Sequence, residues 1–218
     1  MKLLVLGASC GCGQWLVRLA DERGHHVRAL VRPTTPYDPP SGAEVEVLRG
    51  DVLTPSVLDR ALNGCDAVLS ALGIKRKAPW NPWSTLASPP NLTTQVTQHL
   101  VAAMLQHDIY RIVAISAAGV GDSLAEVHPL IQLMINYSNM AASYADLEGM
   151  ENTLSASTLD WMAVRPTTLR DGPPTGNVHL FDHYGLFTRI TRGDVAAWML
   201  NAVEQPTPFT RRTPMIGG

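Results

Sequence analysis

The sequence has few charged residues, and this shortage excludes some classes of function. Of the 218 residues 17% are charged, and the formal net charge is −2 with no block of like charge. A protein that binds nucleic acid by neutralising phosphates normally carries a basic stripe, which this sequence lacks. Hydrophobic residues make up 45% of the chain, which is enough to form a core and argues against a disordered segment.

Lysine is also scarce. The chain has fourteen arginines but only three lysines, Lys2, Lys75 and Lys77. A mechanism that needs a lysine in the second half of the chain is therefore excluded.

Cysteines and long apolar runs are few as well. Three cysteines, without the spacing of a disulfide framework, favour a reducing compartment. The apolar stretch 3–6 is too short for a signal peptide, and no run approaches the roughly 18 apolar residues of a membrane span. We expect a cytoplasmic protein that contacts neither nucleic acid nor membrane.

Short apolar runs that indicate strands alternate with segments of helical periodicity. The predicted strands are 3–6, 25–32, 45–50, 66–73, 110–116, 160–166 and 213–218. Helices are predicted before Gly24 and at 53–62, 92–106, about 128–136, 139–156 and 193–204, with Thr54 as the N-cap of the second. This order predicts an α/β fold: one Rossmann-like domain, 1–218, with a doubly wound, mostly parallel sheet and helices on both faces.

Two segments, 74–91 and 167–187, are predicted as long loops, which are usually functional inside such a fold. They carry aromatic residues that could stack on a flat substrate or simply pack the loops: Trp80, Trp83, Tyr184 and Phe187. We expect them to supply substrate specificity, because the nucleotide-binding fold leaves little chain for a separate substrate domain.

The first predicted turn is rich in glycine. Its residues include Gly7, Ser9, Cys10, Gly11, Cys12 and Gly13. The turn follows a strand and opens a helix, where glycines let backbone approach a pyrophosphate and the helix supplies free N–H groups. The spacing is GxxxGxG rather than GxGxxG, so a glycine-rich turn without a ligand is the alternative. Cys10 and Cys12 lie where a thiolate is stabilised, but small packing residues are the commoner case.

Other candidate residues follow the predicted strands, and ligands of open α/β sheets lie outside these carboxyl ends. Arg32 suits a 2′-phosphate and favours NADP(H) over NAD(H), unless it is simply a solvated arginine. Asp51, followed by Val52, can accept a hydrogen bond from adenine. The alternative is a helix-capping role, which we assign to Thr54 instead. Small or apolar residues end the fourth strand and leave room for a cofactor: Ala71, Leu72 and Gly73.

Several motifs, in order, resemble the atypical short-chain dehydrogenase/reductase superfamily. Within it the sequence is most similar to the small NmrA-like NAD(P)H-binding branch, which includes biliverdin reductase B, a flavin reductase. The motifs are GASCGCG, HHVRALVRP, GDVLTPSVLDRALNGCDAVLSALG, YRIVAISAAGVG, LDWMAVRPTTLRDGP and ITRGDVAAWMLNAVEQP with TPMIGG.

The resemblance implies pyrophosphate binding at 7–13, 2′-phosphate binding at Arg32 and adenine contacts at Asp51 and Val52. It places the nicotinamide near Gly73, Ser116 and Pro166. Two features depart from the family pattern. The second glycine of GxxGxxG falls on Cys10, and the Tyr-xxx-Lys pair is missing, since Tyr144 precedes Glu148 by four residues.

Without that lysine, alcohol–ketone chemistry at a tuned tyrosine is disfavoured. The sequence instead favours an NADP(H)-dependent oxidoreductase that passes hydride to a conjugated small molecule of flavin, quinone or linear tetrapyrrole type. Ser116 is the first catalytic candidate, as a hydrogen-bond donor, unless it only satisfies backbone. Tyr144 is the second, unless it is a half-buried helix tyrosine. The alternatives are a non-enzymatic NADP(H) sensor and an epimerase- or dehydratase-like protein.

We predict no metal site, because His179 and His183 lie in a loop without enough converging ligands. The expected partner is a small-molecule substrate, and the expected assembly is a monomer or a weak homodimer.

Overall fold

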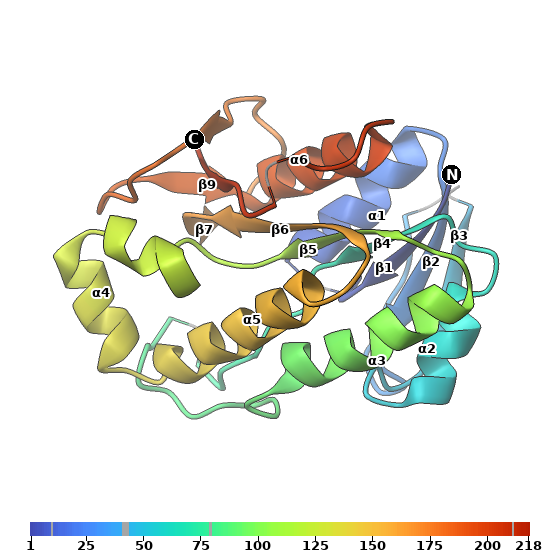
Figure 1. The fold of residues 1–218 in the computed structure, drawn as a ribbon, viewed down its shortest axis with the longest axis horizontal. Coiled ribbons are helices and arrows are strands. Elements are labelled where there is room, and N and C mark those ends of the chain that lie inside the picture. Colours follow the sequence, from blue (N-terminus) through green and yellow to red (C-terminus); the bar gives the residue numbers. More distant parts are fainter. Residues whose placement is uncertain (10, 41–43, 79, 211) are drawn as a thin grey trace.

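The computed structural model describes residues 1–9, 11–40, 44–78, 80–210 and 212–218, and its main feature is one eight-stranded sheet (Figure 1). The strand order is β3-β2-β1-β4-β5-β6-β10-β8. The strands are β1 (Lys2–Leu6), β2 (His26–Val31), β3 (Val45–Arg49), β4 (Ala67–Ser70), β5 (Arg111–Ile115), β6 (Asp160–Pro166), β8 (His179–Leu180) and β10 (Met215–Gly217). Neighbours pair in parallel throughout, except that β8 runs antiparallel to β10.

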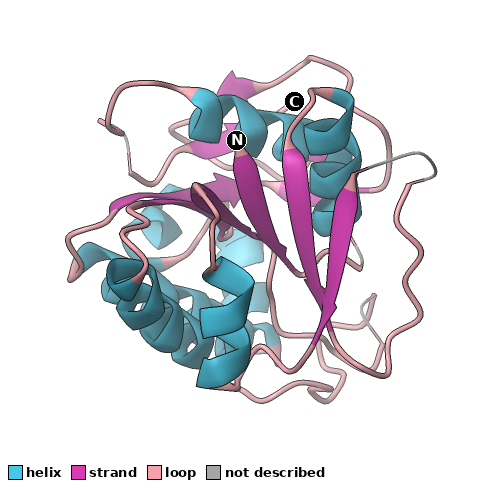
Figure 2. Ribbon diagram, turned by 90° about the vertical axis from the view of Figure 1, so that its right-hand side faces the viewer, coloured by secondary structure: helices cyan, strands magenta, loops and turns pink. Residues whose placement is uncertain are grey.

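Helices cover both faces of the sheet (Figures 1 and 2). One face carries α1 (Cys12–Glu22) and α6 (Arg192–Glu204), and the other carries α2 (Pro55–Leu62), α3 (Leu92–Gln106) and α5 (Met140–Ser155). The strand order reverses at β1 and β4, as in a doubly wound sheet. The predicted Rossmann-like α/β fold is therefore confirmed.

The central strand β1 is apolar throughout because both of its faces are covered. Leu3 and Val5 belong to the core cluster under α1 and α6, whereas Leu4 and Leu6 belong to the cluster under α2, α3 and α5. Side chains of a strand alternate between faces, so a continuous apolar run fills both cores. Burying each leucine contributes about 1.5–3 kcal/mol, which fixes this strand in the middle of the sheet.

The predicted helices agree closely with the structure, and α3 has the predicted bounds. The helix α2 begins at Pro55 after Thr54, but the Thr54 side chain makes no capping hydrogen bond. The helix α4 (Pro129–Asn136) is preceded by a short 3-10 helix, η1 (Gly121–Glu126), which the sequence analysis missed. No helix among the described residues is long and apolar enough to cross a membrane.

The prediction of 167–187 as loop was partly wrong. This segment contains β7 (Thr168–Arg170) and β8, and β7 pairs in parallel with β9 (Arg189–Thr191) in a separate two-stranded sheet. Strands of two or three residues are too short to show periodicity, so only the tertiary pairing reveals them.

Candidate functional site

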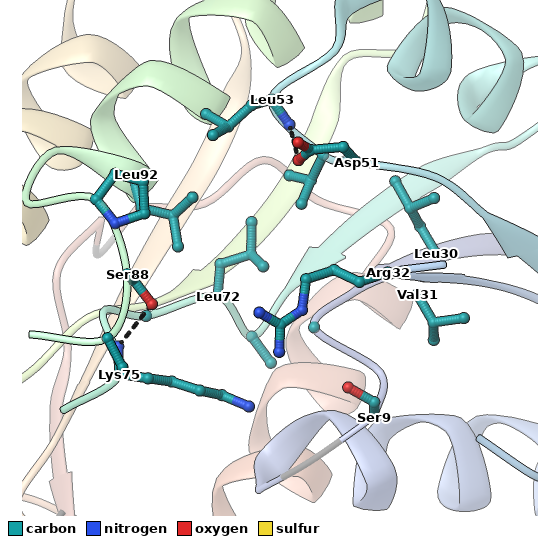
Figure 3. A pocket seen from close by; sticks show the side chains of 16 residues that line it. Ser9, Leu30, Val31, Arg32, Asp51, Leu53, Leu72, Lys75, Ser88 and Leu92 are labelled. Carbon is teal, nitrogen blue, oxygen red and sulfur yellow. Dashed lines mark hydrogen bonds between the residues drawn. The ribbon is translucent and has the colours of Figure 1, made fainter. Parts of the chain in front are cut away.

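A cavity of about 280 Å³ opens at the carboxyl ends of β1, β2 and β4 (Figure 3). The predicted cofactor residues that line it are Gly7, Ser9, Arg32, Asp51, Val52, Ala71, Leu72 and Gly73. They come from four turns that are distant in the sequence, and the parallel strands bring them to one edge of the sheet. We call this space the first cavity.

Two glycines allow the backbone beside the first cavity to pack closely. Gly7 has a φ of +76°, and a Cβ atom there would lie 2.6 Å from the carbonyl oxygen of Ala71. A Cβ atom at Gly13 would lie 2.1 Å from the carbonyl oxygen of Gly7. Only glycine allows the backbone of β1, α1 and β4 to approach this closely. This close packing fits the glycine-rich turns that accept a pyrophosphate.

The helix α1 begins directly beside this turn. Its N-cap residue, Gly11, has a φ of +57°, and no side chain of the described residues caps the helix. The first-turn N–H groups are thus available to an anion, and the helix dipole favours one. Cys12 is buried in the core, as expected of a small packing residue. Cys10 lies outside the described residues.

Two cationic side chains, Arg32 and Lys75, extend into the first cavity from its two sides (Figure 3). The main chain of Lys75 is held in place, because its N–H donates to Ser88 Oγ at 3.1 Å and its carbonyl accepts from the Ala87 N–H at 2.7 Å. Lys75 was not predicted as a site residue, because it follows β4 in a loop without a motif. Two cations on either side suit a ligand with several phosphate charges.

Asp51 makes a local contact in the turn before α2. Its Oδ1 atom accepts a hydrogen bond from the Leu53 N–H at 3.0 Å, as Figure 3 shows. The carboxylate therefore stabilises the turn before α2 while it also lines the first cavity. One oxygen atom is engaged in the turn, and the other can accept from a ligand.

A second cavity, of about 540 Å³, lies at the carboxyl ends of β5 and β6. Both catalytic candidates line it, together with part of the predicted nicotinamide and substrate sites: Ser116, Tyr144, Pro166, Trp80 and Tyr184. Arg76 and Thr167, which the sequence analysis did not select, line it too. The resemblance implied a nicotinamide site near Gly73, Ser116 and Pro166. The structure places Gly73 at the first cavity and the other two at the second.

Ser116 is the end of a buried polar network. Its Oγ donates to Glu151 Oε1 at 2.6 Å, and Arg165 binds both oxygens of that carboxylate at 3.0 and 2.6 Å. Arg165 also forms an ion pair with the exposed Asp122 at 2.7 Å. Because the Ser116 hydroxyl donates its hydrogen bond to Glu151, it offers only lone pairs to the second cavity. We had expected it to act there as a donor.

Tyr144 is the neutral hydroxyl donor of the second cavity. Burial raises the pKa of Tyr144 well above its ordinary value, and the opposing positive charge of Arg76 does not cancel this effect. The phenol therefore stays protonated at neutral pH, and its OH donates to the carbonyl of Ala118 at 3.3 Å. Thr167 contributes a further hydroxyl, and its buried Oγ1 has no hydrogen-bond partner among the described residues.

The four aromatic residues of the long loops have different surroundings. Trp80 is 84% exposed at the second cavity, whereas Tyr184 is buried there and hydrogen-bonded to Thr168. Trp83 and Phe187 are exposed and are not among the residues that line either cavity. The Trp83 Nε1–H donates to the carbonyl of Tyr137 at 3.2 Å, so this indole helps to anchor its loop.

The described residues contain no group of three or more histidine, cysteine, aspartate or glutamate side chains that could hold a metal ion. His179 instead contacts Asn177 Oδ1 through Nε2 at 2.8 Å.

Comparisons with known sequences agree with this geometry. A family model described as NAD(P)H-binding matches residues 7–206. Isoflavone reductase homolog IRL from Zea mays is 36% identical over 80 residues, 33% of this chain and 26% of that protein. 2-alkyl-3-oxoalkanoate reductase from Stenotrophomonas maltophilia is 35% identical over 120 residues, 55% of this chain and 34% of that protein. The matches thus span about a quarter to a third of these relatives.

Solved structures share the fold over nearly the whole chain. ChuY from Escherichia coli, described as an anaerobillin reductase, has a TM-score of 0.77 at 20% identity, covering 99% of this chain and 96% of that one. A short-chain dehydrogenase/reductase from Veillonella parvula in complex with NADP has a TM-score of 0.78 at 18% identity, covering 100% and 94%.

Proposed function

The chain belongs to the NAD(P)H-binding family, and from this premise we propose that it is an NADPH-dependent reductase. Its acceptor is a conjugated small molecule of flavin, quinone or linear tetrapyrrole type. The observation that carries the proposal is the pair of cavities along one edge of the sheet, both bordered by the segment 74–91. The first has the glycine turn and cations of a dinucleotide site, and the second has hydroxyl and aromatic groups. The solved neighbour described as an anaerobillin reductase acts on an acceptor of this kind.

The preference for NADPH rests on Arg32 and Lys75. Both side chains line the first cavity, and Arg32 directly follows β2, where NAD-selective folds usually carry a carboxylate for the ribose 2′-hydroxyl. A guanidinium at this place binds a 2′-phosphate through two parallel hydrogen bonds, which a hydroxyl cannot match. The neighbour crystallised with NADP is in line with this preference.

When bound, the nicotinamide supplies the hydride. The chain itself contributes binding and a protonated hydroxyl. Gly7 and Gly13 let β1, α1 and β4 pack closely beside the phosphate site, and α1 directs its N–H groups toward it. In the second cavity the Tyr144 hydroxyl exchanges its long bond to the Ala118 carbonyl, at 3.3 Å, for one to an acceptor oxygen or nitrogen, while Ser116 keeps its short bond to Glu151 and accepts a hydrogen bond. A conjugated acceptor delocalises the added charge, so the proton can come from water and a strongly acidic group is unnecessary.

Cofactor selectivity is tested with Arg32→Ala. Charge-assisted hydrogen bonds contribute about 1.5–3 kcal/mol, so this change should weaken NADPH binding by roughly 10- to 100-fold and leave NADH binding nearly unchanged. Quenching of protein fluorescence on titration measures both dissociation constants. The control is Arg60→Ala, which removes the same charge from an exposed position on α2. Equal losses for the two cofactors would refute the 2′-phosphate role of Arg32.

Enzyme activity is tested by following NADPH oxidation with FMN, menadione and biliverdin as acceptors. We expect turnover with at least one of them, with NADPH preferred over NADH. Tight NADPH binding without turnover across this panel would contradict the reductase assignment and favour a cofactor-binding sensor.

A further inference from the structure

We propose that the second cavity takes an acceptor that carries an anionic group, a carboxylate or a phosphate, and that Arg76 binds this group. The inference rests on the proposed reductase function and narrows its acceptor class. Flavins with a phosphate and tetrapyrroles with propionate groups meet the requirement, whereas uncharged quinones do not.

The direction of Arg76 follows from the backbone of its loop. Arg76 forms an antiparallel bridge with Leu86, and the flanking bonds run from the Lys77 N–H to the Thr85 carbonyl at 3.0 Å and from the Ala87 N–H to the Lys75 carbonyl at 2.7 Å. Successive side chains of an extended strand point to opposite sides. Lys75 accordingly lines the first cavity and Arg76 lines the second.

Arg76 gives the second cavity its charge. The other described side chains that line it are aromatic, aliphatic or hydroxyl-bearing, and no aspartate or glutamate is among them. The Arg76 charge is close enough to act on Tyr144: burial raises the pKa of that phenol, and Arg76 opposes the rise. In a largely apolar wall a guanidinium attracts an anion more strongly than it does in water.

The residues that follow β5 and β6 form a polar wall of the second cavity, which favours a ligand with complementary polar groups. Ser116 presents lone pairs to the cavity, because its hydroxyl donates a hydrogen bond to Glu151 at 2.6 Å. Thr167 is buried, and its Oγ1 atom has no partner among the described residues. That oxygen is itself buried, so Ser116 is the group that a ligand N–H would meet at this wall. The ligand therefore combines an anionic end toward Arg76 with hydrogen-bonding ring atoms toward β5 and β6.

The remaining wall suits a flat apolar body between these two ends. Met134, Met140 and Leu169 line the cavity, and Trp80 stands exposed at it. Methionine side chains adapt to irregular shapes, and an indole provides a stacking surface. The volume of about 540 Å³ lies within the range of small-molecule sites.

The test compares acceptors with and without an anionic group on the same ring system: FMN with riboflavin, and biliverdin with its dimethyl ester. With saturating NADPH we expect kcat/KM to favour each anionic member by roughly 10- to 100-fold. Arg76→Ala should lower kcat/KM for the anionic members more than for the neutral members and so remove this preference, and Arg76→Lys should restore part of it. The control is Lys77→Ala. Lys77 is next to Arg76 in the sequence, but its side chain is not among those that line either cavity, so this variant should keep the preference for anionic acceptors. The FMN pair and the biliverdin pair separate phosphate from carboxylate recognition.

Equal efficiency for charged and neutral members, or a preference that survives in Arg76→Ala, overturns the inference while the reductase function stands. If no acceptor is reduced, the proposed function fails, and binding then decides the inference. FMN and riboflavin are titrated into the protein saturated with NADP⁺, with protein fluorescence as the readout. Tighter binding of FMN that is lost in Arg76→Ala supports the anion site, and equal or absent binding of both overturns it.

Discussion

Replacing Asp194 should detach the segment 171–176 from the start of α6. This carboxylate is 2% exposed and accepts four hydrogen bonds. Its Oδ1 accepts from the N–H groups of Thr175 and Gly176 at 2.6 and 2.9 Å, and its Oδ2 accepts from the hydroxyls of Thr175 and Thr191 at 2.8 and 2.7 Å. These bonds hold the segment that follows β7 against α6, the helix that packs against α1.

The loss in the free energy of unfolding follows from the number of donors that lose their acceptor in each variant. Asp194→Ala removes the acceptor from all four donors. A hydrogen bond to a charged group contributes about 1.5–3 kcal/mol, and less where water replaces it at the exposed Thr175 and Gly176. The Thr191 hydroxyl also contacts the carbonyl of Pro173 at 2.9 Å, so it keeps a partner. We expect a total loss of about 3–5 kcal/mol for Asp194→Ala. Asp194→Asn keeps one oxygen for the two N–H groups and should lose about 1–2 kcal/mol.

The effect should depend on pH in a defined direction. Burial opposes ionisation of Asp194, but the four hydrogen bonds outweigh it and hold the pKa below its ordinary 3.8. The stabilisation is therefore complete above that ordinary value and is lost as the pH falls through the lower folded-state pKa. Asp194→Asn does not titrate, so its deficit relative to the wild type should shrink over the same acidic range.

Urea unfolding at neutral pH and below about pH 4 measures these differences. Asp171→Asn is the matched control, because that carboxylate lies in the same segment, is almost fully exposed and pairs only with Arg192 among the described contacts. A surface pair of this kind contributes about 0–1 kcal/mol. Equal stability of Asp194→Asn and wild type at neutral pH, or a deficit that persists in acid, would refute the reasoning.

Two further changes test the site. Gly13→Ala puts a methyl group 2.1 Å from a backbone oxygen, so it should lower the melting temperature and weaken NADPH binding, whereas Gly73→Ala, where a Cβ meets open space, should leave the melting temperature unchanged. Glu151→Gln leaves the buried guanidinium of Arg165 without its buried counter-charge and should cost about 3–5 kcal/mol by urea unfolding. Asp122→Asn, at the exposed end of the network, should cost less than about 1 kcal/mol, and comparable losses for the two carboxylates would contradict this account.

Much of the fold could be predicted from the sequence because its signals are local. The apolar run of β1 and the helical period of 92–106 each depend on neighbouring residues, so the sequence shows them directly. Strand ends then located the first cavity, since parallel strands bring Arg32, Asp51 and Gly73 to one edge.

The missed features depend on contacts between distant segments. Glu151 lies 35 residues from Ser116, and on its helix it looks like an ordinary exposed acid until β5 and β6 bury it. Lys75 and Arg76 reach the cavities because of backbone pairing with 85–87, which side-chain periodicity does not encode. The strands β7 and β9 likewise exist only through their mutual pairing.

The pairing that sends Lys75 and Arg76 to opposite sides also makes this short strand a wall that the two cavities share. A single peptide unit joins the two residues, and hydrogen bonds to the segment 85–87 hold their backbone in place. A backbone change that moves one of these cations therefore moves the other, so the two cavities cannot change shape independently at this wall.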